Sequence, residues 1–327
     1  MASATTPVHS GGGTSAPHRV LVPYALADLG PVPEGVDPAA VDVYDGIAEP
    51  PAAHTDVAFY VLPYTFDLAP LRLLADMPRV RVVQTLTAGY EHALPYLPDG
   101  ATLCNGRGIH EASTAELAVT LTLASLRGIP AFVRGQDSGE WLAGFYPALA
   151  DKTVLIVGYG AIGEAVERRL AGFETDIVRV ASRARTTADG APVHAAADLP
   201  KLLPRADVVV LVTPLTAATR GLADAEFLSH MRDGALLVNV SRGAVVDTGA
   251  LLAEVTTGRL TAALDVTDPE PLPADHPLRH APGVLISPHV GGSSSAFLPR
   301  AQRLIHRQLT AWGTGQPLAN IVAGPGA

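Results

Sequence analysis

The sequence predicts an α/β protein with two doubly wound parallel sheets, and three observations support this prediction. Short apolar runs of strand length alternate with helical and turn segments through most of the 327 residues. The alternation occurs in two blocks, which a long apolar helix separates. In the second block, one apolar run breaks into the pattern G-x-G-x-x-G at residues 158–163 and continues as a helical segment.

The first block predicts a sheet of about five strands. Its apolar runs lie at residues 20–22, 41–44, 57–62, 80–85 and 101–104. A helix is predicted at residues 67–77, where Leu68, Leu71 and Leu74 recur at helical spacing.

The separating helix is predicted at residues 113–126, where Ser113 and Glu116 have the spacing of a capping box. Its apolar residues occupy two faces, so it needs two partners, and we expect it between domains or at a subunit contact. We expect it to end at residues 128–130 and a loop to follow at residues 135–150.

The second block predicts a second doubly wound sheet. Its apolar runs lie at residues 153–157, 176–181, 208–213, 235–240, 261–265 and 284–287. Ligands of such sheets bind beyond the carboxyl ends of the strands. Side chains at those ends are therefore the candidates for a functional site.

The glycine motif follows the first strand of the second block. A strand, a tight turn and a helix N-terminus suit a dinucleotide pyrophosphate, because the glycines allow the turn, admit the phosphates and seat the helix on the strand. Similar turns also occur with no nucleotide bound, so the motif alone does not decide the function. The residues expected to contact the coenzyme here are Gly158, Tyr159, Gly160, Ala161, Ile162 and Gly163.

Composition excludes several classes of protein. With 48% hydrophobic and 17% charged residues, the chain is globular, and a net charge of −9 without any Lys/Arg run argues against nucleic acid or anionic membranes as partners. Pro, Arg or Asp interrupts every apolar run before it reaches bilayer length. Residues 1–17 predict a flexible tail without the pattern of a signal peptide. We therefore expect a soluble, cytoplasmic protein.

Cys104 is the only cysteine of the chain. A single cysteine excludes an intrachain disulfide and offers no cluster of metal ligands, so no metal is expected. Its simplest role is that of a small buried hydrophobic residue.

Three strand ends carry side chains suited to carbonyl reduction. Arg242 follows the run at 235–240, Glu270 lies in a Pro-flanked loop after the next run, and His289 follows the last run. An imidazolium protonates a developing alkoxide, a carboxylate on the other ring nitrogen favours that charged form, and an arginine binds a carboxylate. Separately, each residue also fits a structural role as a loop histidine, a surface glutamate or an ion-paired arginine. Their joint placement after successive strands favours the catalytic interpretation.

The order of the glycine motif, Asn239-x-Ser-Arg242-Gly, Asp265-Val-Thr-Asp-Pro-Glu270-Pro and Ser287-Pro-His289-Val-Gly-Gly resembles the D-isomer-specific 2-hydroxyacid dehydrogenase family. The resemblance covers about residue 19 to the C-terminus. It implies that Arg242 binds substrate, Glu270 tunes the histidine, His289 donates or accepts the proton, and Asp265 lies near the nicotinamide amide. The further strand-end residues expected to contact the coenzyme are Thr213, Pro214, Val240, Ser241 and Gly291.

The resemblance also implies a divided architecture. A Rossmann-type coenzyme domain at residues 109–290 is inserted into a flavodoxin-like substrate domain made of residues 18–108 and 291–327. The substrate carboxylate is expected at a glycine turn, and the substrate-binding candidates are Tyr64, Thr87, Ala88 and Gly89. Family members are usually dimers through the helix matching residues 113–126, so we expect a homodimer.

The coenzyme preference is predicted from the end of the second Rossmann strand. An NAD-type domain has an acidic residue there, about 20 residues beyond the glycines, to bind the ribose 2′-hydroxyl. Here Ser182, Arg183 and Arg185 occupy this region, and they suit the 2′-phosphate of NADP. We expect NADP to be preferred over NAD; alternatively, these arginines simply lie on a solvated loop.

The substrate is predicted only as a class, a 2-oxo acid reduced to a D-2-hydroxy acid. Small acids such as glyoxylate or hydroxypyruvate and larger ones such as phenylpyruvate stay open, because Trp141, Phe145 and Tyr146 fit either an apolar pocket or a domain seam. One alternative is a nucleotide-sensing, corepressor-like binding protein. Another is a formate or phosphite dehydrogenase; Glu270 argues against formate, since that branch is expected to pair its histidine with Gln.

Overall fold

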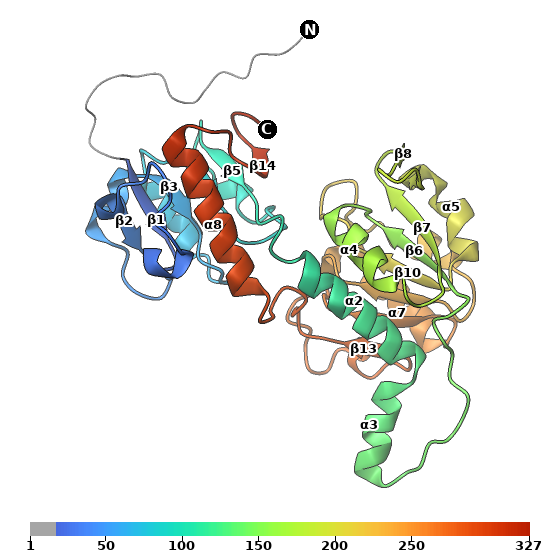
Figure 1. The fold of residues 1–327 in the computed structure, drawn as a ribbon. Coiled ribbons are helices and arrows are strands. Elements are labelled where there is room, and N and C mark those ends of the chain that lie inside the picture. The colour runs from blue at the N-terminus through green and yellow to red at the C-terminus, as the bar shows by residue number, and fades with distance from the viewer. Residues whose placement is uncertain (1–17) are drawn as a thin grey trace. The chain divides into compact units, whose positions relative to one another are not determined.

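The computed structural model describes residues 18–327 and consists of two compact units (Figure 1). Unit 1 comprises the described residues up to His110 together with Ser295–Ala327, and unit 2 comprises Glu111–Ser294. The chain therefore leaves unit 1 once and returns to it once. The tail predicted at residues 1–17 lies outside the described residues.

Unit 1 contains a sheet of six strands in the order β14-β5-β4-β3-β1-β2. The strands are β1 (Arg19–Val22), β2 (Val41–Val43), β3 (Val57–Val61), β4 (Val82–Gln84), β5 (Thr102–Cys104) and β14 (Ile321–Ala323). All neighbours pair in parallel except β14, which lies antiparallel to β5. Apart from β14, this is the flavodoxin-like order predicted for the substrate domain.

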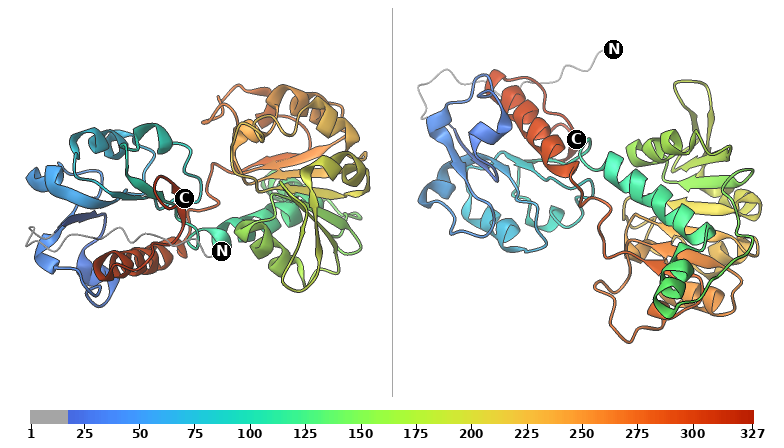
Figure 2. Two further views of the ribbon diagram at one scale, coloured as in Figure 1. Left: turned by 90° about the horizontal axis from the view of Figure 1, so that it is seen from above. Right: turned by 60° about the horizontal axis from the view of Figure 1, so that its bottom comes forward.

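Helix α8 (Phe297–Thr314) lies along one face of this sheet (Figure 2). Its buried side chains, such as Leu304, Ile305 and Leu309, pack with strand residues such as Phe59 and Val61. The opposite face packs on α1 (Ala69–Arg72) and the 3-10 helix Leu73–Asp76, which together occupy the region predicted as one helix. Both faces are covered, which explains why the central strands read as continuous apolar runs.

Unit 2 contains a sheet of eight strands in the order β13-β12-β11-β10-β6-β7-β9-β8. The strands are β6 (Thr153–Val157), β7 (Asp176–Ala181), β8 (Arg185–Thr186), β9 (Pro192–Ala195), β10 (Val208–Leu211), β11 (Leu236–Asn239), β12 (Thr261–Leu264) and β13 (Val284–Ile286). Only β8 is antiparallel to its neighbour. The chain order around β6 is that of a dinucleotide-binding sheet, so the predicted fold class is confirmed.

Helices cover both faces of the second sheet. They are α2 (Glu111–Leu126), α4 (Ala161–Leu170), α5 (Leu199–Leu202), α6 (Ala225–His230) and α7 (Thr248–Thr256). Helix α3 (Ile129–Ser138) follows α2 and extends away from the sheet (Figure 1). Two apolar clusters result, one containing Leu155, Leu211 and Leu237 and the other containing Ile156, Val210 and Val238. Alternate residues of each strand thus face opposite layers.

Two predictions about the helix between the two blocks were wrong: its N-terminus and the loop that follows it. It begins at Glu111, so Ser113 lies inside the helix and cannot be its N-cap; the Ser113 hydroxyl instead lies 2.6 Å from the hydroxyl of Ser294. The chain does turn at Gly128, but a second helix, α3, starts directly afterwards and replaces part of the predicted loop. Pro130 is compatible with it because it occupies the first turn, where no amide donor is needed.

Within residues 18–327, no single helix is long and apolar enough to cross a membrane. Only the bent pair α2 and α3, with 61° between the helices, has that length and composition when taken together. The same part of the chain contains no group of three or more His, Cys, Asp or Glu side chains arranged to hold a metal ion.

Candidate active site

The predicted coenzyme and catalytic residues gather at one edge of the unit 2 sheet. Strands β6, β10, β11, β12 and β13 are parallel, so their carboxyl ends meet at that edge. The glycine turn follows β6, Thr213 and Pro214 follow β10, and Val240 and Ser241 follow β11. This is the edge at which open α/β sheets bind their ligands.

The glycine turn joins β6 directly to α4. Gly158 has a φ of 101°, and a Cβ there would lie 2.6 Å from the amide nitrogen of Thr213. Only glycine therefore fits at this position. The amides of Gly158 and Tyr159 both donate to the carbonyl of Val180, and Gly160 precedes α4 without a side-chain cap. The first amides of α4 are thus available to an anion.

The region predicted to bind the 2′-phosphate lies beside this turn. Strand β7 ends at Ala181, and Ser182 and Arg183 follow it as exposed residues. Arg185 behaves differently, because its guanidinium donates to the carbonyl of Tyr159 and lies 5.9 Å from the centre of the Tyr159 ring. No residue from 181 to 186 is acidic.

Arg242 follows β11 in a loop that Asn239 shapes. The Asn239 amide donates to the carbonyl of Arg242 at 3.0 Å, and its oxygen accepts from the amide and the hydroxyl of Ser241 at 3.0 and 2.6 Å. A Cβ at the next residue, Gly243, would lie 1.9 Å from the carbonyl oxygen of Thr267. The Arg242 loop therefore runs directly against the loop that carries Glu270.

Asp265 holds the loop that carries His289. Its buried carboxylate accepts hydrogen bonds from the Ser287 hydroxyl at 2.6 Å and from the amides of Val290 and Gly291 at 2.9 and 2.8 Å. Its carbonyl accepts from the amide of His289 at 2.8 Å, and His289 itself has a φ of 54°. The sequence did not indicate this positioning role, because backbone amides supply two of the donors.

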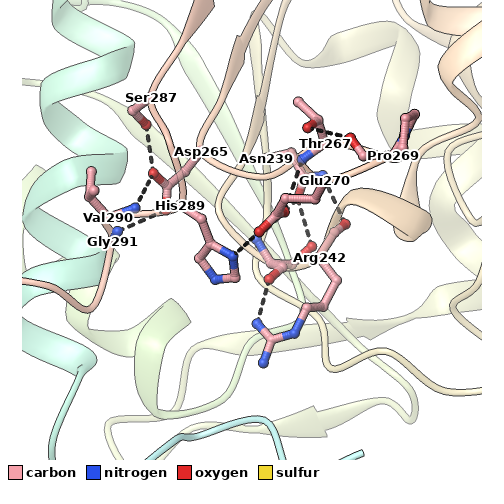
Figure 3. Close-up of polar contacts among 11 residues, drawn as sticks. Asn239, Arg242, Asp265, Thr267, Pro269, Glu270, Ser287, His289, Val290 and Gly291 are labelled. Atoms are coloured by element: carbon pink, nitrogen blue, oxygen red, sulfur yellow. Dashed lines mark hydrogen bonds and ion pairs between the residues drawn. The ribbon is translucent and has the colours of Figure 1, made fainter. Parts of the chain in front are cut away.

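His289 and Glu270 form a pair. The Nδ1 atom of His289 lies 2.5 Å from Oε1 of Glu270, and the two side chains are 30% and 36% exposed. Figure 3 shows that the second ring nitrogen faces away from Glu270 and that Arg242 lies beside the pair. An oriented imidazole with a carboxylate behind it is suited to exchange a proton with a bound substrate.

The substrate-binding candidates Tyr64, Thr87, Ala88 and Gly89 belong to unit 1. The Thr87–Gly89 turn is held by a hydrogen bond from the Asn105 amide to the carbonyl of Ala88 at 2.8 Å and by one from the Gly106 amide to the carbonyl of Thr87 at 2.7 Å. Within the described residues, the three amides of the turn donate to no protein acceptor. These three amides are therefore the donors that the sequence analysis expects to hold an anion.

Tyr64 packs on aromatic rings of the same unit. Its ring centre lies 4.3 Å from that of Phe297 and 5.6 Å from that of His110. The Nε2 atom of His110 lies 2.7 Å from the carbonyl oxygen of Leu86, at the start of the glycine turn. Tyr64 is thereby linked to the turn through His110.

The aromatic residues of the predicted loop lie elsewhere in unit 2. Trp141 and Phe145 are fully exposed, and Tyr146 packs edge-on against Phe132 of α3. A hollow of about 750 Å³ beside α3 is lined by Phe132, Trp141 and Tyr146, among others, and by none of the catalytic candidates.

Comparisons with known proteins identify the family of this chain. The model of the D-isomer specific 2-hydroxyacid dehydrogenase NAD binding domain matches residues 119–291. The human glyoxylate reductase/hydroxypyruvate reductase is 32% identical over 259 residues, which cover 73% of this chain and 76% of that protein. A glyoxylate/hydroxypyruvate reductase B from Pectobacterium atrosepticum is 34% identical over 230 residues, with coverage of 68% and 72%.

Solved structures are similar as well. A D-isomer specific 2-hydroxyacid dehydrogenase from Xanthobacter autotrophicus, in complex with NADPH and MES, has a TM-score of 0.77 and 28% identity, and the match covers 94% of this chain and 98% of that one. The NADPH-dependent glyoxylate/hydroxypyruvate reductase of Sinorhizobium meliloti, in complex with NADP and malonate, has a TM-score of 0.74 and 25% identity, with coverage of 94% and 97%. The chain therefore belongs to the D-isomer specific 2-hydroxyacid dehydrogenase family and is an NAD(P)-dependent oxidoreductase.

Proposed function

We propose that the protein reduces a small 2-oxo acid of the glyoxylate or hydroxypyruvate type to the D-2-hydroxy acid, with NADPH as the preferred coenzyme. The observation that carries this proposal is the His289–Glu270 pair beside Arg242, at the sheet edge that follows the glycine turn. The relatives named glyoxylate/hydroxypyruvate reductase, at 32% and 34% identity, support the substrate class.

The residues of the turn fit a dinucleotide. The close approach of Gly158 to the backbone of Thr213 leaves no room for a side chain, and α4 begins with uncapped amides. Within the described residues, the hydroxyl oxygen of Thr213 is buried and has no hydrogen-bond partner. A coenzyme lying across this turn would supply the hydride for the reaction.

The side chains have separate tasks in this mechanism. Arg242 binds the substrate carboxylate and polarises the carbonyl through charge-assisted hydrogen bonds. His289, as imidazolium, gives its Nε2 proton to the carbonyl oxygen as that oxygen gains negative charge, and Glu270 keeps the ring oriented through Nδ1. In the reverse direction, His289 removes the hydroxyl proton. The amides of Thr87, Ala88 and Gly89 would also hold the substrate carboxylate.

The coenzyme preference rests on Ser182 and Arg183, which are exposed beside the glycine turn. Both would bind the 2′-phosphate, whereas Arg185 would support the turn through the carbonyl of Tyr159. We expect kcat/KM to be higher with NADPH than with NADH, and Arg183→Gln to lower the NADPH value by about tenfold while sparing the NADH value. A clear preference of the wild type for NADH would contradict this assignment.

A panel of 2-oxo acids tests the reaction itself. Glyoxylate, hydroxypyruvate and phenylpyruvate are offered with each coenzyme, and oxidation of the nicotinamide is followed by absorbance. His289→Gln and Arg242→Gln should each lose at least about 100-fold in kcat/KM. Coenzyme binding without reduction of any acid would instead favour a nucleotide-sensing protein. Full activity of the His289 variant would refute the mechanism. In a separate assay, reduction of the oxidised coenzyme by phosphite, together with no reduction of any 2-oxo acid, would reassign the substrate.

A homodimer through α2 is proposed as well. Leu117, Leu123 and Leu126 of this helix are only partly buried within unit 2, and Thr120 is exposed. A second copy packed on the side of the helix that carries Thr120 would bury more of these partly exposed leucines. Sedimentation velocity should show a dimer for the wild type and for Glu226→Arg on α6, but a monomer for Thr120→Arg. A monomeric wild type would contradict the proposal.

A further inference from the structure

Helix α8 of unit 1 carries three arginines that have no acidic partner among the described residues. Arg300, Arg303 and Arg307 recur on one face of the helix, and residues 297–314 contain no Asp or Glu. Within the described residues, none of the three forms an ion pair, and residues 1–17 contain no acidic side chain either. Like charges at this spacing repel each other and weaken a helix. The arrangement is unexpected in a chain with a net charge of −9.

These arginines line a cavity of about 470 Å³. Arg107, from the segment after β5, faces the same cavity, and its backbone is held in place by Asn105 and Asn320. The buried side chains of Leu29 and Leu304 contribute apolar surface. His306 also lines the cavity, and its buried Nε2 has no hydrogen-bond partner within residues 18–327.

The size of the cavity and the side chains that line it indicate the chemical class of its ligand. Small-molecule sites commonly measure about 300–1,000 Å³, so the cavity suits a metabolite more than a single inorganic ion or a protein surface. Guanidinium groups bind the paired oxygens of phosphate and carboxylate groups through two parallel hydrogen bonds. Within residues 18–327, none of these four arginines forms an ion pair with an acidic side chain, so together they match an anion with at least two negative charges.

We propose that this cavity is a binding site for a small organic polyanion, either a phosphate ester or a polycarboxylate, separate from the coenzyme and catalytic residues. All residues that line it belong to unit 1, whereas the glycine turn, Arg242 and His289 belong to unit 2. The bound anion would join the middle of α8 to the segment at Arg107. Arg107 lies within a few residues of the point where the chain passes from unit 1 to unit 2.

Calorimetry of the full-length protein tests this site. Pyrophosphate and citrate serve as probes, and saturating NADP occupies the anion sites expected in unit 2. The pocket variant is Arg303→Gln/Arg307→Gln. The control variant, Arg72→Gln/Arg81→Gln, removes the same charge from two exposed arginines of unit 1 outside the cavity.

We expect the wild type and the control variant to bind one of the probes with the same affinity, and the pocket variant to bind it at least about tenfold more weakly. Stronger binding of pyrophosphate than of citrate would identify the phosphate class, and the reverse order the polycarboxylate class. Because Arg303 and Arg307 are exposed, the pocket variant should keep the melting temperature of the ligand-free protein. Equal binding by the pocket variant and the wild type, or no binding of either probe to the wild type, would overturn the proposal.

Discussion

The Nδ1 atom of His289 lies 2.5 Å from a carboxylate oxygen of Glu270, and the two residues come from loops that follow neighbouring strands, β13 and β12. The contact fixes which ring nitrogen faces the carboxylate, so the other nitrogen is the one presented to a substrate. The pair thus depends on the sheet, which brings together residues 19 positions apart in the chain.

Glu270→Gln should show whether the His289–Glu270 pair depends on the negative charge of Glu270 or only on the position of its side chain. The amide keeps the size and one hydrogen bond, but it no longer stabilises a charged imidazolium. We expect kcat to fall by about 100-fold, as for the loss of a general acid–base contribution, with the coenzyme dissociation constant unchanged. Steady-state kinetics and coenzyme fluorescence titration measure the two quantities. Glu226→Gln on the exposed side of α6 should leave both unchanged, and an unimpaired kcat in Glu270→Gln would disprove the role of the pair.

Asp265→Asn should disturb the His289 loop without touching the histidine. The carboxylate accepts hydrogen bonds from the hydroxyl of Ser287 and from two loop amides. In the asparagine variant, the side-chain NH2 group would face one of these donors and could not accept its hydrogen bond. A buried donor left without an acceptor costs about 1–3 kcal/mol. Urea unfolding should therefore show a loss of that size, together with a lower kcat. A variant with the stability of the wild type would show that the carboxylate does not hold the loop.

Gly243→Ala should separate the loops that carry Arg242 and Glu270. The new Cβ would lie 1.9 Å from the carbonyl oxygen of Thr267, so one of the two backbones must move. We expect a loss of at least about 2 kcal/mol in unfolding free energy, in the range of strongly destabilising substitutions, and a large loss of kcat/KM. The matched control is Gly249→Ala in α7, where the nearest atom would lie 3.4 Å away. The control should change stability by no more than about 1 kcal/mol.

The elements of the fold that the sequence predicted are the strands that are buried along most of their length. The central strands β3, β6, β10 and β11 are buried over all or nearly all of their length, and their apolar runs locate them. Strands β8, β9 and β14 were missed, because they are short and exposed or half-buried and depend on pairing with distant residues.

The wrong predictions for the start and the end of the helix between the two blocks have local causes. The capping-box spacing of Ser113 and Glu116 suggested a start, but a helix that already runs from Glu111 needs no cap at Ser113. Pro130 suggested a stop, yet a proline also fits the first turn of a new helix.

The sequence predicted the residues of the candidate site and the pairing of His289 with Glu270, but it did not predict the backbone contacts that support them. Parallel strands end at a common edge, so the positions of Arg242, Glu270 and His289 after successive strands predict that they gather in space. The support that Asp265 gives to the His289 loop depends on backbone amides, and every residue except proline carries one. The side-chain types therefore contain no signal for it. The same holds for the backbone contact at Gly243.

Cys104 should be unreactive in the folded protein. Its side chain is fully buried in unit 1, and burial raises the pKa of the thiol to about 12. Because the thiolate is the reactive form, a maleimide or a disulfide reagent at pH 8 should label less than about one tenth of the native protein in the time needed for complete labelling in denaturant. Mass spectrometry gives the labelled fraction. Rapid stoichiometric labelling of the native protein would show that this part of the sheet opens.

Glu167 of α4 should make stability depend on acid pH. It is bound by the Arg179 guanidinium and by the Tyr159 hydroxyl at 2.5 Å, which ties the helix to β7 and to the glycine turn. Burial opposes ionisation of this carboxyl, but the hydrogen bonds from Arg179 and Tyr159 prevail and hold its pKa below its ordinary value of 4.5. Burial, followed by the contact with Glu167, raises the pKa of Tyr159 to about 12, so the phenol stays a donor at neutral and acid pH.

A folded-state pKa below the unfolded value means that Glu167 stabilises the protein above pH 4.5, and that this stabilisation disappears as the pH falls through the lowered value. Glu167→Gln should therefore cost about 1 kcal/mol at pH 7, allowing for partial solvent screening, and the difference from the wild type should shrink below pH 4.5. Urea unfolding at several pH values measures this difference. The control Glu164→Gln, an exposed position of the same helix, should cost less at pH 7. A Glu167→Gln difference that stays constant down to pH 3 would show that the ionised carboxylate is not what stabilises the turn.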